Sequence, residues 1–292
     1  QAPDEGTGTD AILVAAGIQA TSEGDFSSSS NATKLEFMTG SSEAATTQMT
    51  ISSGGIVGIG AGVPGDLGVG LHIKSADSGF AAHTSADELV LENNGHCGIS
   101  ILSADDATGN IYFSDASSGT GRYQGFVEYN HNSNQLALGS ANDYWLKMDS
   151  AGHVTMPLQP AFAAEGSGTT TNPASGAQIV FDTEIYDVNG DFASNTFTAP
   201  VTGKYQLNAS VRYGNMDASC TYNLMQLTTS NRAYYHILAG AALAADAGYV
   251  EFNISMIVDM DANDTADVAY AYAGGAQQTD MQTRYFTGAL VC

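Results

Sequence analysis

Short segments in which apolar and polar residues alternate, bounded by glycine and serine, recur along almost the whole chain and restrict what it can fold into. At 48–60, for example, Met49 and Ile51 alternate with polar neighbours, 52–55 is rich in serine and glycine, and 56–59 is apolar again. Period two is typical of a half-buried β-strand, and a glycine-containing turn between two such runs predicts a β-hairpin. The chain is therefore expected to be built from strands and tight turns.

The same unit returns further along the chain. Residues 134–157 repeat the order strand, loop, strand, turn, strand, with the turn at 149–152. Three more pairs with period two lie between the two copies and predict three short strands: Leu89 and Leu91, Ile99 and Ile101, and Ile111 and Phe113. The apolar run at 12–19 is too short, and too closely flanked by glycine and threonine, to predict a helix. Reuse of one supersecondary unit is the natural interpretation.

These units cannot bury their apolar faces alone. Each is a hairpin or a three-stranded piece, and an isolated hairpin is marginally stable in water. We therefore expect the faces to pack against copies from other chains, most simply in a homotrimer about a long axis.

The pattern changes at 157–160, where Pro157 and Pro160 predict an extended linker. Longer, aromatic-rich strands follow at 10- to 20-residue spacing: 178–186, 195–214, 221–227, 233–240, 249–260, 265–274 and 284–292. That spacing is typical of an antiparallel sandwich or jelly roll. The expected fold class is all-β. The expected domains are two shaft modules at 1–66 and 67–157 and a jelly-roll head at 158–292.

The net charge excludes some partners. Thirty-one acidic residues stand against eight Lys and Arg, giving a formal net charge of −23. A polyanion is repelled by phosphate backbones and anionic lipid surfaces, so neither nucleic-acid binding nor membrane insertion is expected. Bound divalent cations would fit this charge, and solubility through self-repulsion explains it equally well without them.

No residue pattern predicts catalysis. The six histidines are dispersed, and no pair of carboxylates is marked out by spacing. The three cysteines, Cys97, Cys220 and Cys292, are too far apart for a CxxC motif and too few for a disulfide framework. We therefore expect that the protein is not an enzyme. The chain begins with Gln1, which suggests a processed product or a piece of a longer protein.

Residues 158–292 resemble the globular head of complement component one subcomponent q, which has the tumour-necrosis-factor-like jelly roll. The matching segments occur in the family's order: AFAA (161–164), NGDF (189–192), APVTGKY (199–205), VDMDANDTADVAY (258–270) and YFTGALV (285–291). The resemblance implies a ten-stranded jelly roll that assembles as a compact trimer.

Residues 1–157 resemble the repeat modules of phage tail fibres and related virion appendages, especially those of marine phages. The segments that carry this resemblance are TKLEFMTG (33–40), TTQMTISSGGIVGIG (46–60), DELVLENNGHCGISIL (87–102), GNIYFSDA (109–116) and YWLKMDSAGHVTM (144–156). The second copy departs from the pattern, because Met156 stands where Gly-Ile-Gly usually ends the unit. A last shaft module that meets a head would explain this.

The two resemblances imply a homotrimeric fibre tip on the outside of a virion. Its N-terminal end would join other virion proteins, and its head would attach to a host-surface glycan or protein. The alternatives are a purely structural virion protein (a head decoration, whisker or tail connector) and a cellular adhesin or filament subunit.

Two loops of the head are the candidate binding surface. The segments 214–220 and 273–283 are polar, rich in glycine and small residues, and connect long strands at one end of a jelly roll. Binding usually resides on loops held by a rigid scaffold. The candidate binding residues are Asn215, Asp217, Gln277, Gln278, Thr279 and Asp280.

An acidic segment of the head is a candidate calcium site. Asp259, Asp261 and Asp264 resemble the start of a calcium loop, but Asp264 and Tyr270 occupy the positions where an EF-hand needs Gly and Glu. Related heads often hold calcium, so the resemblance makes Ca²⁺ the candidate cofactor. The alternative is an acidic turn that only connects two strands.

Overall fold

The structure is a computed structural model that describes residues 13–41, 44–60, 70–275 and 279–292. The chain divides into two compact units, Gln1–Ile101 and Leu102–Cys292, each of which is described by itself. The described residues form β-strands and two short 3₁₀ helices, with no α-helix among them, so the all-β fold class is confirmed. None of the helices in the described ranges is long and apolar enough to cross a membrane.

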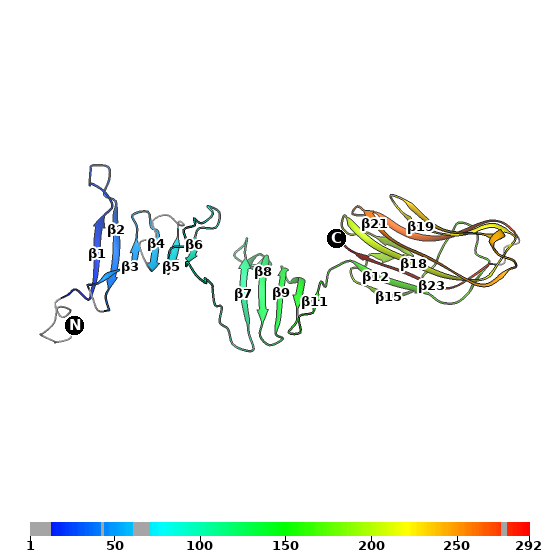
Figure 1. Ribbon diagram of the computed structural model, residues 1–292, viewed down its shortest axis with the longest axis horizontal. Helices are drawn as coiled ribbons and strands as arrows, with labels where there is room; N and C mark the ends of the chain where they lie inside the picture. The colour runs from blue at the N-terminus through cyan, green and yellow to red at the C-terminus, as the bar shows by residue number, and fades with distance from the viewer. Residues whose placement is uncertain (1–12, 42–43, 61–69, 276–278) are drawn as a thin grey trace. The chain divides into compact units, whose positions relative to one another are not determined.

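The first unit contains one six-stranded sheet whose strands follow chain order, β1 to β6 (Figure 1). Its strands are β1 (Ala16–Ser22), β2 (Thr33–Thr39), β3 (Thr46–Ile51), β4 (Val57–Gly60), β5 (Leu71–Lys74) and β6 (Leu89–Glu92). The pairs from β1 to β4 are antiparallel, whereas β4, β5 and β6 pair in parallel. This parallel part was not predicted from the sequence.

The hairpin predicted at 48–60 is confirmed as β3 and β4. The Ser52 amide donates to the Ile56 carbonyl at 2.9 Å, and the Ile56 amide donates to Ser52 Oγ at 3.0 Å. Gly55 has a φ of +84°, which glycine adopts without a steric cost.

The predicted domain boundary at 66/67 lies outside the described residues, and β4 and β5 on either side of it belong to one sheet.

The second unit begins with an antiparallel sheet in the order β11-β10-β9-β8-β7. Its elements are β7 (Thr108–Phe113), the 3₁₀ helix η2 (Gly119–Tyr123), β8 (Gly125–Asn130), β9 (Gln135–Ser140), β10 (Asp143–Met148) and β11 (Val154–Thr155). The turn predicted at 149–152 lies between β10 and β11. There Asp149 Oδ1 accepts the amides of Ala151 and His153, both at 2.9 Å.

The strand predicted around Ile99 and Ile101 is wrong. No strand occurs between β6 and β7, and both isoleucines are exposed. Alternation alone does not make a strand, because a strand also needs a neighbour whose backbone groups are free to pair.

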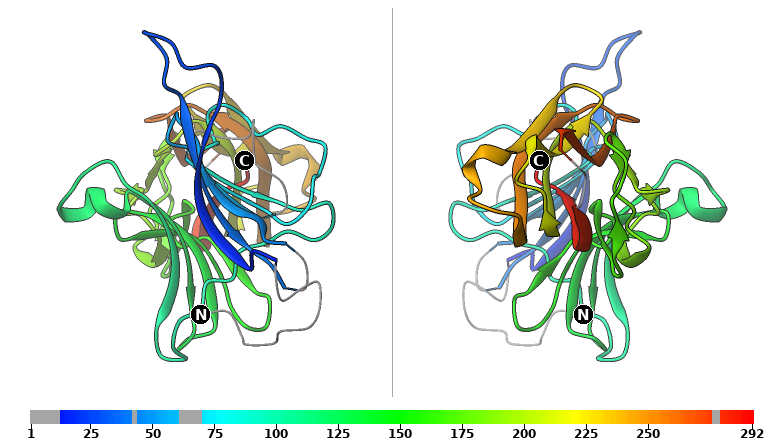
Figure 2. Two further views of the ribbon diagram at one scale, coloured as in Figure 1. Left: turned by 90° about the vertical axis from the view of Figure 1, so that its left-hand side faces the viewer. Right: turned by 90° about the vertical axis from the view of Figure 1, so that its right-hand side faces the viewer.

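The head is an antiparallel sandwich of two sheets, which form opposite layers (Figures 1 and 2). The first layer has the order β15-β12-β23-β18-β21, with β13 beside β23; the second has the order β16-β17-β22-β19-β20, with β14 beside β22. The elements are β12 (Ala161–Gly166), β13 (Thr170–Thr171), β14 (Ala177–Gln178), β15 (Thr183–Asp187), β16 (Phe192–Ala193), β17 (Thr196–Thr198), β18 (Gly203–Met216), β19 (Cys220–Thr229), β20 (Ala233–Ala239), the 3₁₀ helix η3 (Gly240–Ala242), β21 (Ala247–Met260), β22 (Thr265–Gly274) and β23 (Asp280–Leu290).

Aromatic rings fill the core between the two layers. Phe162 stacks on Phe192 and Phe197 at centroid distances of 4.9 and 4.8 Å, and meets Phe286 edge-on at 5.0 Å. All four rings are buried, and offset or edge-on pairs of this kind are the favoured aromatic geometries. The predicted jelly-roll sandwich is confirmed. The predicted boundary at 157/158 falls between β11 and β12 and stays a prediction.

Candidate functional site

The two loops predicted to bind a receptor meet at one end of the head. The first joins β18 to β19 and the second joins β22 to β23. Gly214 is in register with Asp280, and Cys220 with Gly274, so the two loops leave neighbouring strands. Gln277 and Gln278 lie outside the described residues.

The four described candidates divide into two kinds. Asn215 is exposed and donates from Nδ2 to Asp280 Oδ2 at 3.0 Å, which links the two loops. Asp217 and Thr279 are buried; Asp217 Oδ1 accepts the Ser219 amide at 2.7 Å, and the Thr279 carbonyl accepts the Asn172 amide at 3.1 Å. The buried pair therefore shapes the loops. The recognition role of the whole set stays a prediction.

Tyrosines lie beneath these loops. Tyr270 donates from its hydroxyl to Asn223 Oδ1 at 2.6 Å, and burial raises the pKa of Tyr270 to about 12. Burial also raises the pKa of Tyr213 well above its usual range. Both side chains are buried and therefore belong to the core, not to a recognition surface.

The acidic segment around Asp259, Asp261 and Asp264 contains the turn between β21 and β22, which agrees with the alternative that it connects two strands. Asp264 Oδ2 accepts Asn231 Nδ2 and the Asp261 amide, both at 2.9 Å, and Asp259 pairs with Arg232 at 2.9 Å. Hydrogen bonding to its own backbone amide and then the Arg232 charge hold the pKa of Asp259 below its usual range.

The carboxylates of this turn are engaged separately. Among the described residues, no group of three or more His, Cys, Asp or Glu side chains is gathered to hold a metal ion. A cavity of about 310 Å³ beside the turn is lined by Asp259, Asp261 and also Lys204, whose charge opposes a cation. Calcium binding stays a prediction, and it would require these side chains to regroup.

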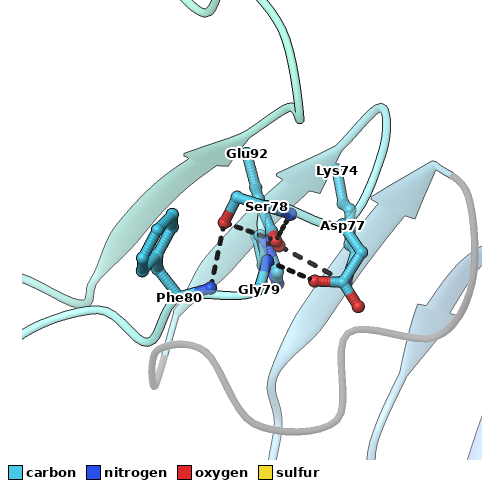
Figure 3. A network of polar contacts seen from close by, with 7 residues as sticks. Lys74, Asp77, Ser78, Gly79, Phe80 and Glu92 are labelled. Atoms are coloured by element: carbon cyan, nitrogen blue, oxygen red, sulfur yellow. Dashed lines mark hydrogen bonds and ion pairs between the residues drawn. The ribbon is translucent and has the colours of Figure 1, made fainter.

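A polar network that sequence reasoning missed lies in the first sheet (Figure 3). Glu92 Oε1 accepts the amide and hydroxyl of Ser78 at 2.6 and 3.0 Å, and Oε2 lies 3.0 Å from His72 Nε2 and 3.4 Å from Lys74 Nζ. The Ser78 amide, the Ser78 hydroxyl and the Lys74 charge together lower the pKa of Glu92 to about 2. Because Ser78 belongs to the connection between β5 and β6, Glu92 fixes that connection to the sheet.

Glu36 makes a second network on the same face of this sheet. It accepts Gln19 Nε2 at 2.9 Å and the Thr21 hydroxyl at 2.7 Å, and it pairs with Lys34 at 2.9 Å. The hydrogen bond from Lys34, followed by those from Thr21 and Gln19, lowers the pKa of Glu36 to about 2. Glu36, Thr50, His72 and Glu92 are all buried, so the buried strand residues with polar side chains lie on this face of the sheet.

The opposite face of the first sheet is apolar and carries two rows that cross all six strands in register. The first row is Ala20, Leu35, Ile51, Val57, Leu71 and Leu89. The second row is Ile18, Phe37, Met49, Ile59, Ile73 and Leu91. None of these side chains is buried, and Ile18 is 70% exposed.

The second sheet repeats this arrangement. One face carries the row Ile111, Val127, Leu138 and Leu146 and the row Tyr129, Leu136, Met148 and Val154. All eight side chains are partly or largely exposed. The two-residue period predicts that such residues share one face of the sheet, but it does not predict whether that face is buried or exposed in the single chain.

The fold defines an all-β chain with a C-terminal jelly-roll head, and the comparisons with known proteins concern that head. No protein-family model and no curated protein matches the chain. Among solved structures, the globular domain of zebrafish complement 1qA protein is 16% identical and matches 46% of this chain and 98% of its own length, with a TM-score of 0.38.

Two further structures match a similar share of the chain. PRD1 vertex protein P5 is 14% identical over 46% of this chain and 99% of its own, with a TM-score of 0.31. Murine APRIL is 10% identical over 45% of this chain and 99% of its own, with a TM-score of 0.34. At these identities the likeness concerns the fold of the C-terminal part alone.

Proposed function

We propose that the protein is the tip of a homotrimeric phage fibre that attaches the virion to a host surface without enzymatic activity. The observation that carries this proposal is the exposed apolar face of each shaft sheet. On the polar face of the first sheet Glu36 and Glu92 are hydrogen-bonded within the chain, whereas no side chain of the two apolar rows is buried.

Such rows need a partner. Fully burying one Leu or Ile side chain contributes about 1.5–3 kcal/mol relative to leaving it exposed. Contiguous exposed apolar patches larger than a few hundred Å² mark interaction surfaces. A second copy of the same chain carries the same apolar rows, so each row can be buried against its own counterpart. Three copies related by one symmetry axis would provide such counterparts for both shaft sheets.

A trimer would present three heads to the host surface, which strengthens attachment. Three weak sites on one trimer can raise avidity by about 10²–10⁴ when they engage together. The exposed parts of the two loops that meet at one end of the head would supply the contact, with Asn215 and Asp280 as the described candidates.

The oligomer is tested by the mass of the purified chain in solution. Light scattering is expected to give three times the 30.2-kDa chain. Ile73→Asp places a charge in an apolar row and is expected to give monomers or aggregates. Ile99→Asp, at an exposed isoleucine outside any strand, is the matched control and should leave the trimer intact. A trimer of unchanged thermal stability with Ile73→Asp would contradict the role of the rows.

Attachment is tested separately with the recombinant trimer. Saturable binding to host cells that Asn215→Ala with Asp280→Ala weakens would support the loops as the receptor surface. If the trimer does not bind, and virions lacking the protein stay infectious, the structural virion role would replace attachment.

A further inference from the structure

A cavity of about 190 Å³ opens on the second sheet, on the face opposite its apolar rows. Its lining consists of four aromatic rings, one carboxylate and one amide: Tyr112, Tyr123, Phe126, Tyr144, Glu128 and Asn142. This is not the face whose apolar rows the proposed assembly would bury.

The strand register builds the cavity. Tyr112, Phe126, Gly139 and Tyr144 are paired in one row across β7, β8, β9 and β10. A Cβ atom on Gly139 would lie 2.2 Å from the Asp143 backbone oxygen and 2.4 Å from Phe126 Cζ, so only glycine lets the β10 backbone and the Phe126 ring both lie so close to β9. The cavity therefore depends on a glycine in the middle of a strand, where glycine normally weakens pairing.

The rings stand as inclined walls. Phe126 and Tyr144 meet at 83° with centroids 5.6 Å apart, and Tyr112 and Tyr123 meet at 48° with centroids 6.1 Å apart. The Tyr123 hydroxyl donates to Asn142 Oδ1 at 3.1 Å. Asn142 has a φ of +115°, a rare conformation for a residue with a side chain, and such strain is found at binding sites.

The carboxylate makes the cavity electronegative. Glu128 is half-buried and accepts the Tyr144 hydroxyl at 3.3 Å, and none of the ion pairs among the described residues includes it. Burial and then the Glu128 charge raise the pKa of Tyr144. Lys147 Nζ lies 3.8 Å from the centroid of the Tyr144 ring, so the side chain's own cation already occupies one face of this ring.

We propose that this cavity binds a quaternary or methylated ammonium group. Several aromatic rings beside a carboxylate can attract such cations, because ring faces and the carboxylate both present negative potential. A sugar would be better served by one flat ring platform than by rings inclined at 48° and 83°. The acidic chain, with a net charge of −23, favours the approach of a cation.

The test is calorimetric titration of the full-length protein with choline, beside its neutral carbon isostere dimethylbutanol and N-acetylglucosamine. Choline is expected to bind saturably and the other two are not. Tyr112→Leu removes an exposed ring and should weaken choline binding roughly 2- to 30-fold. Glu128→Gln should weaken it up to about fivefold. Tyr235→Leu, at an equally exposed tyrosine of the head, is the matched control and should not change it.

Each other outcome overturns the proposal. Equal binding of choline and dimethylbutanol would show an apolar pocket without a role for charge. Binding of N-acetylglucosamine alone would make the cavity a glycan site, and binding of none of the three would leave it without this function. An unchanged far-ultraviolet spectrum and melting temperature show that a variant with lost binding is still folded. The result does not depend on whether the protein attaches a virion.

Discussion

Replacing Gly288 by alanine tests how closely the head is packed. Gly288 lies in β23 between Phe162 of β12 and Leu207 of β18, in register with both. A Cβ atom there would lie 2.5 Å from Phe162 Cε1 and 2.6 Å from Leu207 Cδ2. The Phe162 ring is held by Phe192, Phe197 and Phe286 and has no room to move aside.

Two opposing contributions set the magnitude. Alanine in place of a strand glycine stabilises a protein by roughly 0.5–1 kcal/mol where space allows, because the unfolded chain loses conformational freedom. Forcing an extra carbon into a well-packed core costs about 1–3 kcal/mol. The net destabilisation is therefore expected to be about 0–2.5 kcal/mol, which for a domain of this size lowers the melting temperature by up to about 10 °C.

The assay is urea and thermal unfolding followed by near-ultraviolet circular dichroism. Gly248→Ala is the matched control, because Gly248 lies in β21 with no atom within 4 Å of an added Cβ. It should be neutral or slightly stabilising. Combining Gly288→Ala with Phe162→Leu should restore part of the loss, with a coupling of about 0.5–3 kcal/mol. A Gly288→Ala variant as stable as Gly248→Ala would refute the packing argument.

Four further predictions follow from the other elements. The pKa of Glu92 is lowered from 4.5 to about 2, so its stabilising effect is present above about pH 4.5 and is lost as the pH falls towards 2. Glu92→Gln should therefore lessen the drop in melting temperature between about pH 5 and about pH 3. Glu88→Gln, at an exposed neighbour, is the control and should not change that drop. A thiol reagent should label the exposed Cys97 and Cys292 of the native protein at once and Cys220 only on unfolding, because Cys220 is buried and burial raises its pKa. Millimolar calcium should raise the melting temperature if the acidic turn at 259–264 binds it, and an unchanged melting curve would end that hypothesis. Deleting 158–292 should leave a shaft that aggregates or stays monomeric, and a soluble trimer of 1–157 by light scattering would show that the head does not initiate assembly.

Much of the fold could be predicted because strands and turns are local. Met49 and Ile51 identify β3 through period two, and the turns at 52–55 and 149–152 are fixed by their own serine, aspartate and glycine residues. The strand expected at Ile99 and Ile101 failed because pairing is not local. The parallel pairing of β4, β5 and β6 was missed for the same reason, since short connections normally join antiparallel strands.

The candidate site was predicted less well, because chemistry depends on which side chains the register brings together. The loops at 214–220 and 273–283 do meet, yet Asp217 and Thr279 turn inward, which composition cannot show. The network of Glu92 was missed because its partners His72, Lys74 and Ser78 come from a different strand and a connection.

Glycine paired with an aromatic ring recurs in two of the three sheets of the second unit. Phe126 lies across Gly139 in one sheet, and Phe162 lies across Gly288 in the other. In a sequence read by propensity, both glycines mark a strand as weak. In the structure each glycine leaves space for the aromatic ring of its partner on the neighbouring strand. At Gly288 that ring, Phe162, packs in the core; at Gly139 the ring, Phe126, lines a cavity. The two outcomes differ because a second sheet covers Phe162, whereas Tyr112, Tyr123 and Tyr144 leave a space beside Phe126. A glycine in a strand of this protein is therefore better interpreted through the residue opposite it than through its own propensity.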